Sequence, residues 1–321
     1  MPTAHSLPPR ALPRRFRQPR LLLAGCGDVA ARIARLLNAR GERYRIRALL
    51  RHTPDSPAWS TWRALGITPI AADLDQPRSL HRLRGIADNV IYLAPPAENQ
   101  PTDYRLNRFL AALHGGRSLS RQAPHRLVLI GTTGVYGDRQ GAITSETSRI
   151  NPHTARGRRR AAAEQIFRRW GHRSGPTGGI LRVPGIYAAD RLPVDRLRAG
   201  TPALRPEDDT WTNHIHADDL ARISWLALYR SGTLRAINAC DKSQLKMGDW
   251  FDAVADATGL PRPERLPRAL LKERVSPMMY SFMSESRRLT NTRLTEELRI
   301  RLIYPTVHDF LATLKATHAD D

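Results

Sequence analysis

The chain has little cysteine and no long hydrophobic run, and each shortage narrows what it can be. It contains two cysteines, Cys26 and Cys240, and neither has other metal-ligating side chains at useful spacing. We therefore expect no metal site, and such low cysteine content favours a reducing, cytoplasmic setting. No stretch approaches the roughly 18 consecutive apolar residues of a membrane span, so we expect no membrane partner.

Acidic residues and lysine are scarce beside arginine. The chain of 321 residues carries 51 Lys+Arg against 30 Asp+Glu, a net charge of +21, and nearly all the basic residues are arginine. Such a balance is typical of nucleic-acid binding, which would weaken steeply with salt. The arginines are spread along the whole chain, however, and a GC-rich coding sequence would also favour arginine over lysine. We therefore rank nucleic-acid binding third among the functions considered.

Residues 1–18 are rich in arginine and proline and lack the apolar core of a secretory signal. We expect a disordered tail there, or a start codon placed too far upstream. The remaining length is sufficient for one large or two modest domains.

The most informative segment is a glycine-rich turn between an apolar run and an amphipathic pattern. Residues 21–37 read LLLAGCGDVAARIARLL. A strand, a G-x-G-x-x-A turn and a helix in this order are typical of dinucleotide binding, because the glycines let the backbone approach a pyrophosphate and the helix N-terminus offers free N–H groups. The predicted cofactor-binding residues of this turn are Gly25, Cys26, Gly27, Asp28, Val29 and Ala30. The alternatives are a turn without a ligand and, for Cys26, a redox-sensitive thiol rather than a small residue that fits.

Strand and helix patterns alternate along the rest of the chain. Strand patterns occur at 44–50, 67–72, 89–93, 126–130, 179–183 and 236–239, and helical patterns at 104–113, 156–170 and 218–229. This alternation predicts an α/β fold with a doubly wound parallel sheet of the Rossmann type. We place that domain at 19–186, with 214–240 returning to it, and a smaller, mostly helical substrate region at 187–213 and 241–321.

The end of the second predicted strand bears on the choice of cofactor. An acidic residue at that point binds the ribose 2′-hydroxyl of NAD, whereas this chain has Arg51 followed by His52. We therefore predict NADP in preference to NAD, with an ordinary surface arginine as the alternative. After the third strand, Asp73 and Leu74 are placed to meet the adenine, unless Asp73 caps a helix.

Several motifs occur in the order seen in one known family. They are the glycine turn, TTGVYGD at 132–138, LRVPGIY at 181–187 and NHIHADD at 213–219. The chain resembles extended short-chain dehydrogenases of the NAD-dependent epimerase/dehydratase family, and more narrowly its atypical YeeZ-like branch, which the segment at 287–306 also resembles. The resemblance covers residues 19 to about 316 and says little about substrate.

The resemblance implies an active site made of a Ser/Thr, a Tyr and a Lys, the last two in a Y-x-x-x-K helix. Thr132 matches the Ser/Thr position, with Thr133 as the neighbouring candidate. The tyrosine and lysine positions hold Arg156 and Arg160. Arginine stays protonated, so Arg156 is a poor acid or base, although Arg160 could still hydrogen-bond a ribose.

Two tyrosines are candidate substitutes for the missing one. Tyr136 lies beside the Thr132 turn, and Tyr187 falls in the loop that covers the nicotinamide in the family. For both, a packed aromatic near the site is the favoured alternative. The resemblance also implies cofactor contacts from Ala94, Pro95, Pro184 and Gly185, and substrate contacts from Asn213 and His216. For His216 a structural histidine is the favoured alternative, and family habit points to a homodimer through the helix holding Arg160.

These observations predict an NAD(P)-binding oxidoreductase or epimerase that acts on a hydroxylated or sugar-like small molecule. The missing Tyr and Lys favour a second possibility, a non-catalytic NADP-dependent redox sensor. The fold is better supported than the activity, since a fold does not fix a function.

Overall fold

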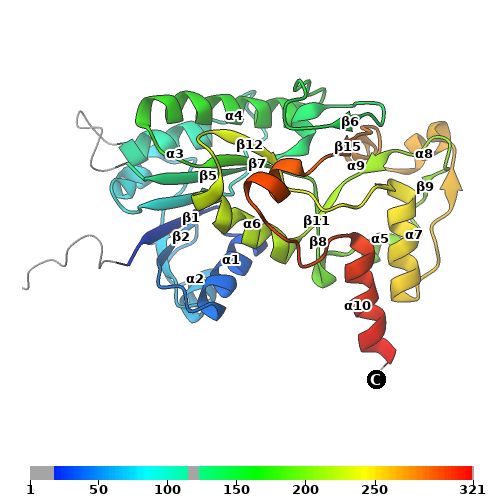
Figure 1. Ribbon diagram of the computed structural model, residues 1–321, viewed down its shortest axis with the longest axis horizontal. Helices are drawn as coiled ribbons and strands as arrows, with labels where there is room; N and C mark the ends of the chain where they lie inside the picture. Colours follow the sequence, from blue (N-terminus) through cyan, green and yellow to red (C-terminus); the bar gives the residue numbers. More distant parts are fainter. Residues whose placement is uncertain (1–17, 115–122, 320–321) are drawn as a thin grey trace, which may run out of the picture.

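The computed structural model describes residues 18–114 and 123–319, so the predicted tail, apart from Gln18, lies outside the described residues. A seven-stranded parallel sheet in the order β12-β7-β5-β4-β1-β2-β3 forms the larger part of the molecule (Figure 1). Its strands are β1 (Arg20–Ala24), β2 (Arg45–Leu50), β3 (Thr68–Ala71), β4 (Asn89–Tyr92), β5 (Arg126–Thr132), β7 (Gly179–Val183) and β12 (Arg235–Asn238). The fold-class prediction is confirmed, and every strand predicted from the sequence is present within two residues of its expected bounds.

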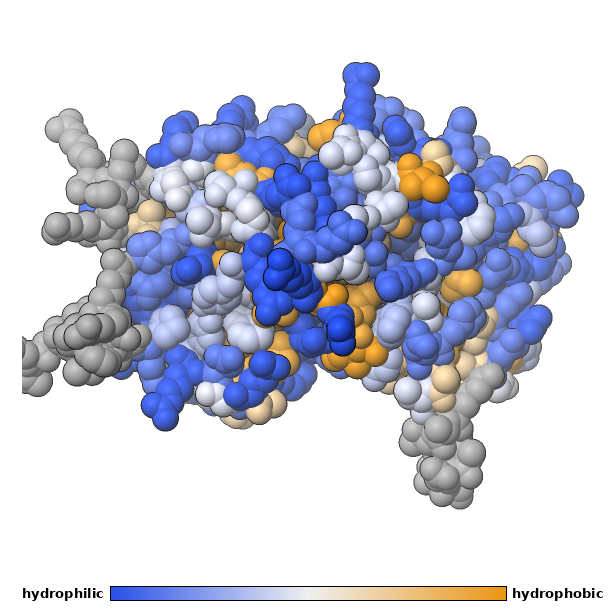
Figure 2. All heavy atoms as spheres, viewed as in Figure 1, coloured by the Kyte–Doolittle hydropathy of each residue, from blue (hydrophilic) through white to orange (hydrophobic). Residues whose placement is uncertain are grey.

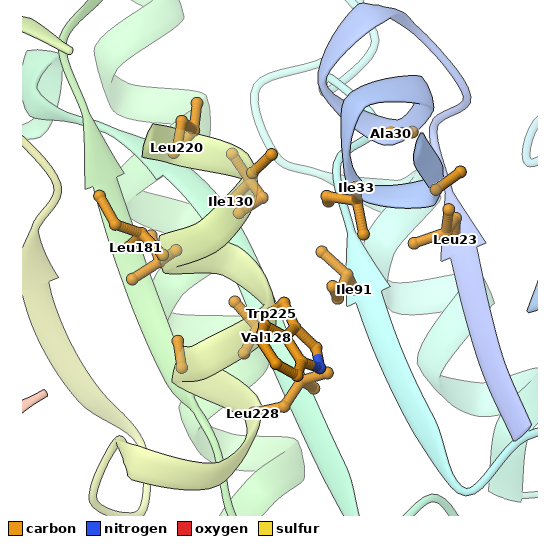
Figure 3. Packing of buried hydrophobic residues seen from close by; sticks show 14 of the residues in the cluster. Leu23, Ala30, Ile33, Ile91, Val128, Ile130, Leu181, Leu220, Trp225 and Leu228 are labelled. Carbon is orange, nitrogen blue, oxygen red and sulfur yellow. The ribbon is translucent and has the colours of Figure 1, made fainter. Parts of the chain in front are cut away.

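Helices cover both faces of the sheet. On one face lie α1 (Asp28–Ala39), α2 (Pro57–Ala64) and α6 (Ala217–Arg230), and on the other η2 (Pro77–Leu83), α3 (Tyr104–His114) and α4 (Ala155–Ser174). Alternate residues of each strand therefore enter two separate cores. In the first core, Ile33 of α1 faces Leu23 and Ile91, and Leu220 of α6 lies near Ile130 (Figure 3).

The order of the strands determines where a ligand can enter. The chain winds outward from β1 to β3, then returns to the other side of β1 to add β4 and β5. At this reversal the connections leave β1 and β4 in opposite directions, which opens a crevice beyond their carboxyl ends.

A smaller, mostly helical part lies beside the sheet (Figure 1). Its helices are η4 (Ala189–Arg191), α5 (Val194–Arg198), α7 (Met247–Thr258), α8 (Arg268–Arg274), α9 (Pro277–Phe282) and α10 (Val307–Ala319), and η3 (Thr133–Tyr136) follows β5. Four short strand pairs lie in or beside this part: β8 (Gly185–Tyr187) with β11 (His214–His216), β6 (Ile143–Thr144) with β15 (Arg288–Leu289), β9 (Ala203–Leu204) with β14 (Arg265–Leu266), and β10 (Trp211–Thr212) with β13 (Leu245–Lys246).

One segment of the predicted substrate region belongs structurally to the sheet domain. The turn η5 (Arg293–Glu297) packs near β12, and Leu294, Leu298 and Ile300 enter the first core. The buried carboxylate of Asp219 accepts hydrogen bonds from the N–H groups of Ile303 at 2.8 Å and Tyr304 at 3.0 Å. These long-range contacts hold the chain against α6 before it leaves for α10.

The surface reflects the composition. Figure 2 shows a face covered mainly by hydrophilic residues, with hydrophobic ones confined to smaller patches. In the described part of the chain, no helix combines the length and apolar character needed to cross a membrane.

Candidate functional site

A cavity of about 560 Å³ lies where the carboxyl ends of the strands meet the N-terminus of α1. It receives the following predicted cofactor residues: Gly25, Cys26, Gly27, Asp28, Val29, Ala30, Arg51, His52, Asp73, Leu74, Ala94, Pro95 and Pro184. The predicted catalytic residues Thr132 and Arg160 also line it. Residues from seven separate segments of the chain therefore line one cleft, and we refer to it as the first cavity.

The two glycines of the turn differ in what they require. Gly25 has φ +100°, and a Cβ there would lie 2.3 Å from the backbone N of Ala94, which itself donates to the Ala24 carbonyl at 3.0 Å. The loop after β4 thus packs so closely on Gly25 that only glycine fits. A Cβ on Gly27 would meet nothing within 4 Å, so this position faces open space at the start of α1.

The N-terminus of α1 borders the first cavity, and a helix start of this kind is a favourable place for an anion. The helix begins after Gly27 without a side-chain cap, and the first N–H groups of a helix have no intrahelical partners. Burial disfavours ionised Asp28, but hydrogen bonds from Arg32 and Arg191 outweigh it and hold the pKa of Asp28 below its usual value. Arg191, from the short η4 turn, thereby places a second cation at this end of the cleft.

The loops after β2 and β3, the strands on one side of β1, also border the cavity. Arg51 and His52 are exposed at its mouth. The Asp73 carboxylate accepts from the N–H of Asp75 at 2.9 Å, so it closes a local turn instead of capping η2, whose N-cap is Gln76. Neighbouring Asp75 pairs with Arg105 at 2.6 Å, and this hydrogen bond lowers the pKa of Asp75 to about 2.

Thr132 and Arg160 lie at the inner end of the first cavity. The Thr132 hydroxyl accepts from the N–H of Gly134 at 3.3 Å, which fixes its direction at the end of β5. The Arg160 guanidinium donates to the Ile130 carbonyl at 3.1 Å, and burial lowers its pKa. Arg160, at the position where the resembled family has lysine, therefore lines the first cavity.

A second cavity of about 710 Å³ adjoins the first, and Thr132, Pro184, Ile186 and Arg191 line both. Residues of the smaller, mostly helical part and of the turn after β5 form its walls. They include Thr133, Arg156, Gly185, Tyr187, Asn213, Arg196, Trp250, Met278, Phe282 and Met283. A substrate in the second cavity would thus lie next to a dinucleotide in the first.

Two predicted site residues lie in neither cavity. Tyr136 is fully buried, and its hydroxyl donates to Asn238 and accepts from Arg182 at 2.8 Å. The His216 ring accepts from the Asp218 N–H at 3.2 Å as the N-cap of α6 and packs on aromatic side chains. Both are structural because buried hydrogen bonds occupy them, so the catalytic role of Tyr136 and the substrate role of His216 are not supported.

Asn213 and Tyr187 line the second cavity, where backbone groups hold Asn213 and the Tyr187 hydroxyl is buried without a hydrogen-bond partner among the described residues. The Asn213 amide donates to the Arg287 carbonyl at 2.9 Å and accepts from the Leu289 N–H at 2.8 Å. Tyr187 is 1% exposed, and burial raises its pKa. Next to it, burial raises the pKa of Asp241 to about 7, so this carboxyl is largely protonated below neutrality.

Asp241→Asn should stabilise the protein at about pH 8. In the unfolded chain the carboxyl ionises near the ordinary aspartate pKa of 3.8, whereas in the fold it keeps its proton to about 7. The folded state therefore binds more protons in that interval, and stability is lost as pH rises through it. The variant should gain more than about 1.4 kcal/mol at pH 8, the worth of one pKa unit, and less near pH 5. Thermal melts of the wild type and the variant at both pH values test this, with the exposed Asp195→Asn as control. An equal loss of stability at both pH values would contradict the prediction.

Some lining residues had no local signal in the sequence. Arg105, Arg191 and Arg196 look like any other arginine in this chain, and only the fold brings them to the cavities. Ile130 and Gly131 could have been found from the rule that ligands bind at the carboxyl ends of parallel strands.

Comparison with known proteins agrees with this architecture. Protein YeeZ of Escherichia coli (strain K12) is 27% identical over 179 residues, which cover 56% of this chain and 62% of YeeZ, less than two thirds of that relative. A conserved protein of unknown function from Silicibacter pomeroyi has a TM-score of 0.74 at 28% identity, over 94% of this chain and 99% of its own.

More distant structures share the fold. UDP-glucuronic acid 4-epimerase from Bacillus cereus, solved with UDP-glucuronic acid and NAD, has a TM-score of 0.70 at 16% identity, over 94% of this chain and 99% of its own. The model of the NAD dependent epimerase/dehydratase family matches residues 21–240, which include every strand of the main sheet except the first residue of β1. The chain therefore belongs to the NAD dependent epimerase/dehydratase family.

Proposed function

We propose that the first cavity binds a nicotinamide dinucleotide and that the second cavity holds a small-molecule substrate beside it. The observation that carries this proposal is the meeting of the glycine turn, the uncapped start of α1, Arg51 and Thr132 in one cleft. The cavity volume of about 560 Å³ falls within the range of cofactor sites. The residues present fit the group: open space at Gly27 and the cations Arg191 and Arg51 suit its phosphates.

We propose NADP as the preferred cofactor, because Arg51 and His52 occupy the place where an acidic residue would select NAD. Arg51→Asp should weaken NADPH binding by about 1–3 kcal/mol, the worth of charge-assisted hydrogen bonds to a phosphate, and leave NADH binding unchanged or tighter. Calorimetric titration of both dinucleotides measures this. Exposed Arg63→Asp on α2 is the matched control, and equal weakening of NADPH and NADH by Arg51→Asp would contradict the assignment.

For the reaction, we propose oxidoreduction or epimerisation of a hydroxylated or sugar-like molecule. A bound nicotinamide supplies hydride acceptance or donation. Thr132 would hydrogen-bond the substrate oxygen, and Arg160 would hold the cofactor ribose from the position of the family's lysine. Arg156 reaches the second cavity and can hold a negative charge, but a guanidinium does not exchange a proton near neutral pH.

A second function, that of a non-catalytic NADP-dependent redox sensor, is favoured by one observation. Neither candidate tyrosine is poised for proton transfer: Tyr136 and Tyr187 are buried, and burial raises the pKa of both hydroxyls. Assaying NADP(H) turnover with sugars and carbonyl compounds separates the two. Turnover that Thr132→Val removes supports the enzyme, and tight cofactor binding without turnover supports the sensor.

A further inference from the structure

The second cavity contains an arginine, Arg196, for which the described residues provide no counter-ion. Arg196 of α5 donates to the Pro202 carbonyl at 3.1 Å, contacts the sulfur of Met283 at 3.5 Å and lies over the Phe251 ring at 4.0 Å. Its Nε is buried with no acceptor, and within the described ranges no carboxylate lies at ion-pair distance from it. Burial, with nothing to offset it, lowers the pKa of Arg196 to about 10, so it remains charged at neutral pH.

A buried charge normally has a partner, because desolvation without pairing is costly. Two other cations of this cavity, Arg191 and Arg287, do have carboxylate partners. Arg191 pairs with Asp28 at 3.1 Å and Arg287 with Glu285 at 2.9 Å. Arg156 packs on the Phe282 ring at 4.0 Å, so it and Arg196 contact the consecutive residues Phe282 and Met283. Two guanidinium groups thus approach one segment of the cavity wall.

Three neutral polar side chains of the cavity are already hydrogen-bonded to backbone groups, whereas the Tyr187 hydroxyl and His214 Nδ1 are buried without a partner in the described part of the chain. Ser276 caps α9 through the Met279 N–H at 3.2 Å, Ser281 donates to the Met278 carbonyl at 2.6 Å, and both ends of the Asn213 amide are bonded. Thr133, Thr212, Tyr187 and His214 also line the cavity and leave polar groups for a substrate hydroxyl. Much of the remaining wall is apolar or aromatic, including Met247, Trp250, Met278, Met279, Phe282 and Met283.

We propose that the second cavity takes a hydroxylated small molecule with one anionic group, a carboxylate or a phosphate, on a partly apolar body, and that Arg196 binds the anion. This inference rests on the proposed function, because it names the substrate class of the same site. The Met, Trp and Phe side chains would bury the apolar body, while the guanidinium would gain the charge partner that the protein does not provide.

The test uses the full chain and four probes: phenylacetate, phenyl phosphate, the neutral phenylacetamide, and acetate. Each is titrated by calorimetry with and without saturating NADPH. Phenylacetate or phenyl phosphate should bind at least about tenfold more tightly than phenylacetamide or acetate, since the site uses both charge and apolar surface. The tighter of the two anions identifies the group that Arg196 prefers.

Arg196→Met should weaken binding of the preferred anion at least about tenfold. Arg198→Met is the matched control on the same helix, because Arg198 is 67% exposed and lines neither cavity, and it should change nothing. Arg156→Met is a second variant. Because Arg156 is exposed, its replacement leaves the core intact, and it should also weaken binding of the preferred anion.

Equal affinity for the anions and phenylacetamide, or unchanged anion binding in Arg196→Met, would overturn the inference. NADPH binding without any anion binding would overturn it as well, yet leave the proposed cofactor site standing. Failure to bind NADPH would instead overturn the proposed function.

Discussion

We expect Gly25→Ala to destabilise the protein by about 3–5 kcal/mol and to abolish dinucleotide binding, because the methyl group adds left-handed strain and overlaps packed backbone. The new Cβ would lie 2.3 Å from Ala94 N, 2.6 Å from Leu93 C and 2.7 Å from Ala94 Cα. These are backbone atoms of the loop after β4, so no side chain can move aside to make room. Denaturant unfolding and NADPH titration measure the two effects.

Gly27→Ala is the matched control within the same turn. Its Cβ would contact nothing within 4 Å, and its φ of −101° is accessible to alanine. Stability should change by less than about 0.5 kcal/mol, as for surface substitutions. Dinucleotide binding should still weaken, because the methyl occupies the open space where a pyrophosphate would approach the helix. Equal destabilisation by both substitutions would contradict this division of roles.

Glu164→Gln should cost about 3–5 kcal/mol of stability, the usual loss when one partner of a buried ion pair is removed. Glu164 and Arg182 are both nearly inaccessible, and two hydrogen bonds of 2.9 and 2.8 Å join them beneath Gly131. A glutamine leaves the Arg182 charge uncompensated. Its amide N–H group would also face an N–H group of Arg182, so two donors would oppose each other. The pair also orients the Tyr136 hydroxyl, so the loss extends to the turn that follows Thr132.

The double variant Glu164→Met with Arg182→Met should be less destabilised than the sum of the two single changes, because no unpaired charge remains. Arg262→Gln, which removes an exposed pair with Asp256 at 2.7 Å, should cost less than about 1 kcal/mol. Urea unfolding of all the variants compares them. A loss for Glu164→Gln no larger than for Arg262→Gln would contradict the account.

The sequence predicted the main sheet because its strands are short apolar runs that end in turn residues. Such runs are typical of strands that are buried on both faces of a parallel sheet. It predicted most of the first cavity for the same reason, since the carboxyl ends of parallel strands converge. For His216 and Tyr136 the structure agrees with the favoured alternatives, a structural histidine and a packed aromatic. Their motifs indicate the strand and the turn, whereas the direction of each side chain depends on partners such as Asp218 and Asn238.

Most of the second cavity could not be predicted from the sequence. Arg196 and Phe282 lie far apart in the sequence and meet only through packing in the small domain. No periodic pattern links such residues. Nor could the sequence show that Leu294 and Leu298 would return to the first core, because a short π-helical turn places them there. The predicted homodimer through α4 and the cytoplasmic setting stay predictions.

The central claim is that the first cavity binds a nicotinamide dinucleotide, and calorimetric titration of the full chain with NADPH and NADH tests it most directly. The account predicts saturable binding at one site per chain, tighter for NADPH, and weaker by at least about tenfold in Gly27→Ala. Absence of saturable binding for both dinucleotides, or affinity unchanged in Gly27→Ala, would contradict it.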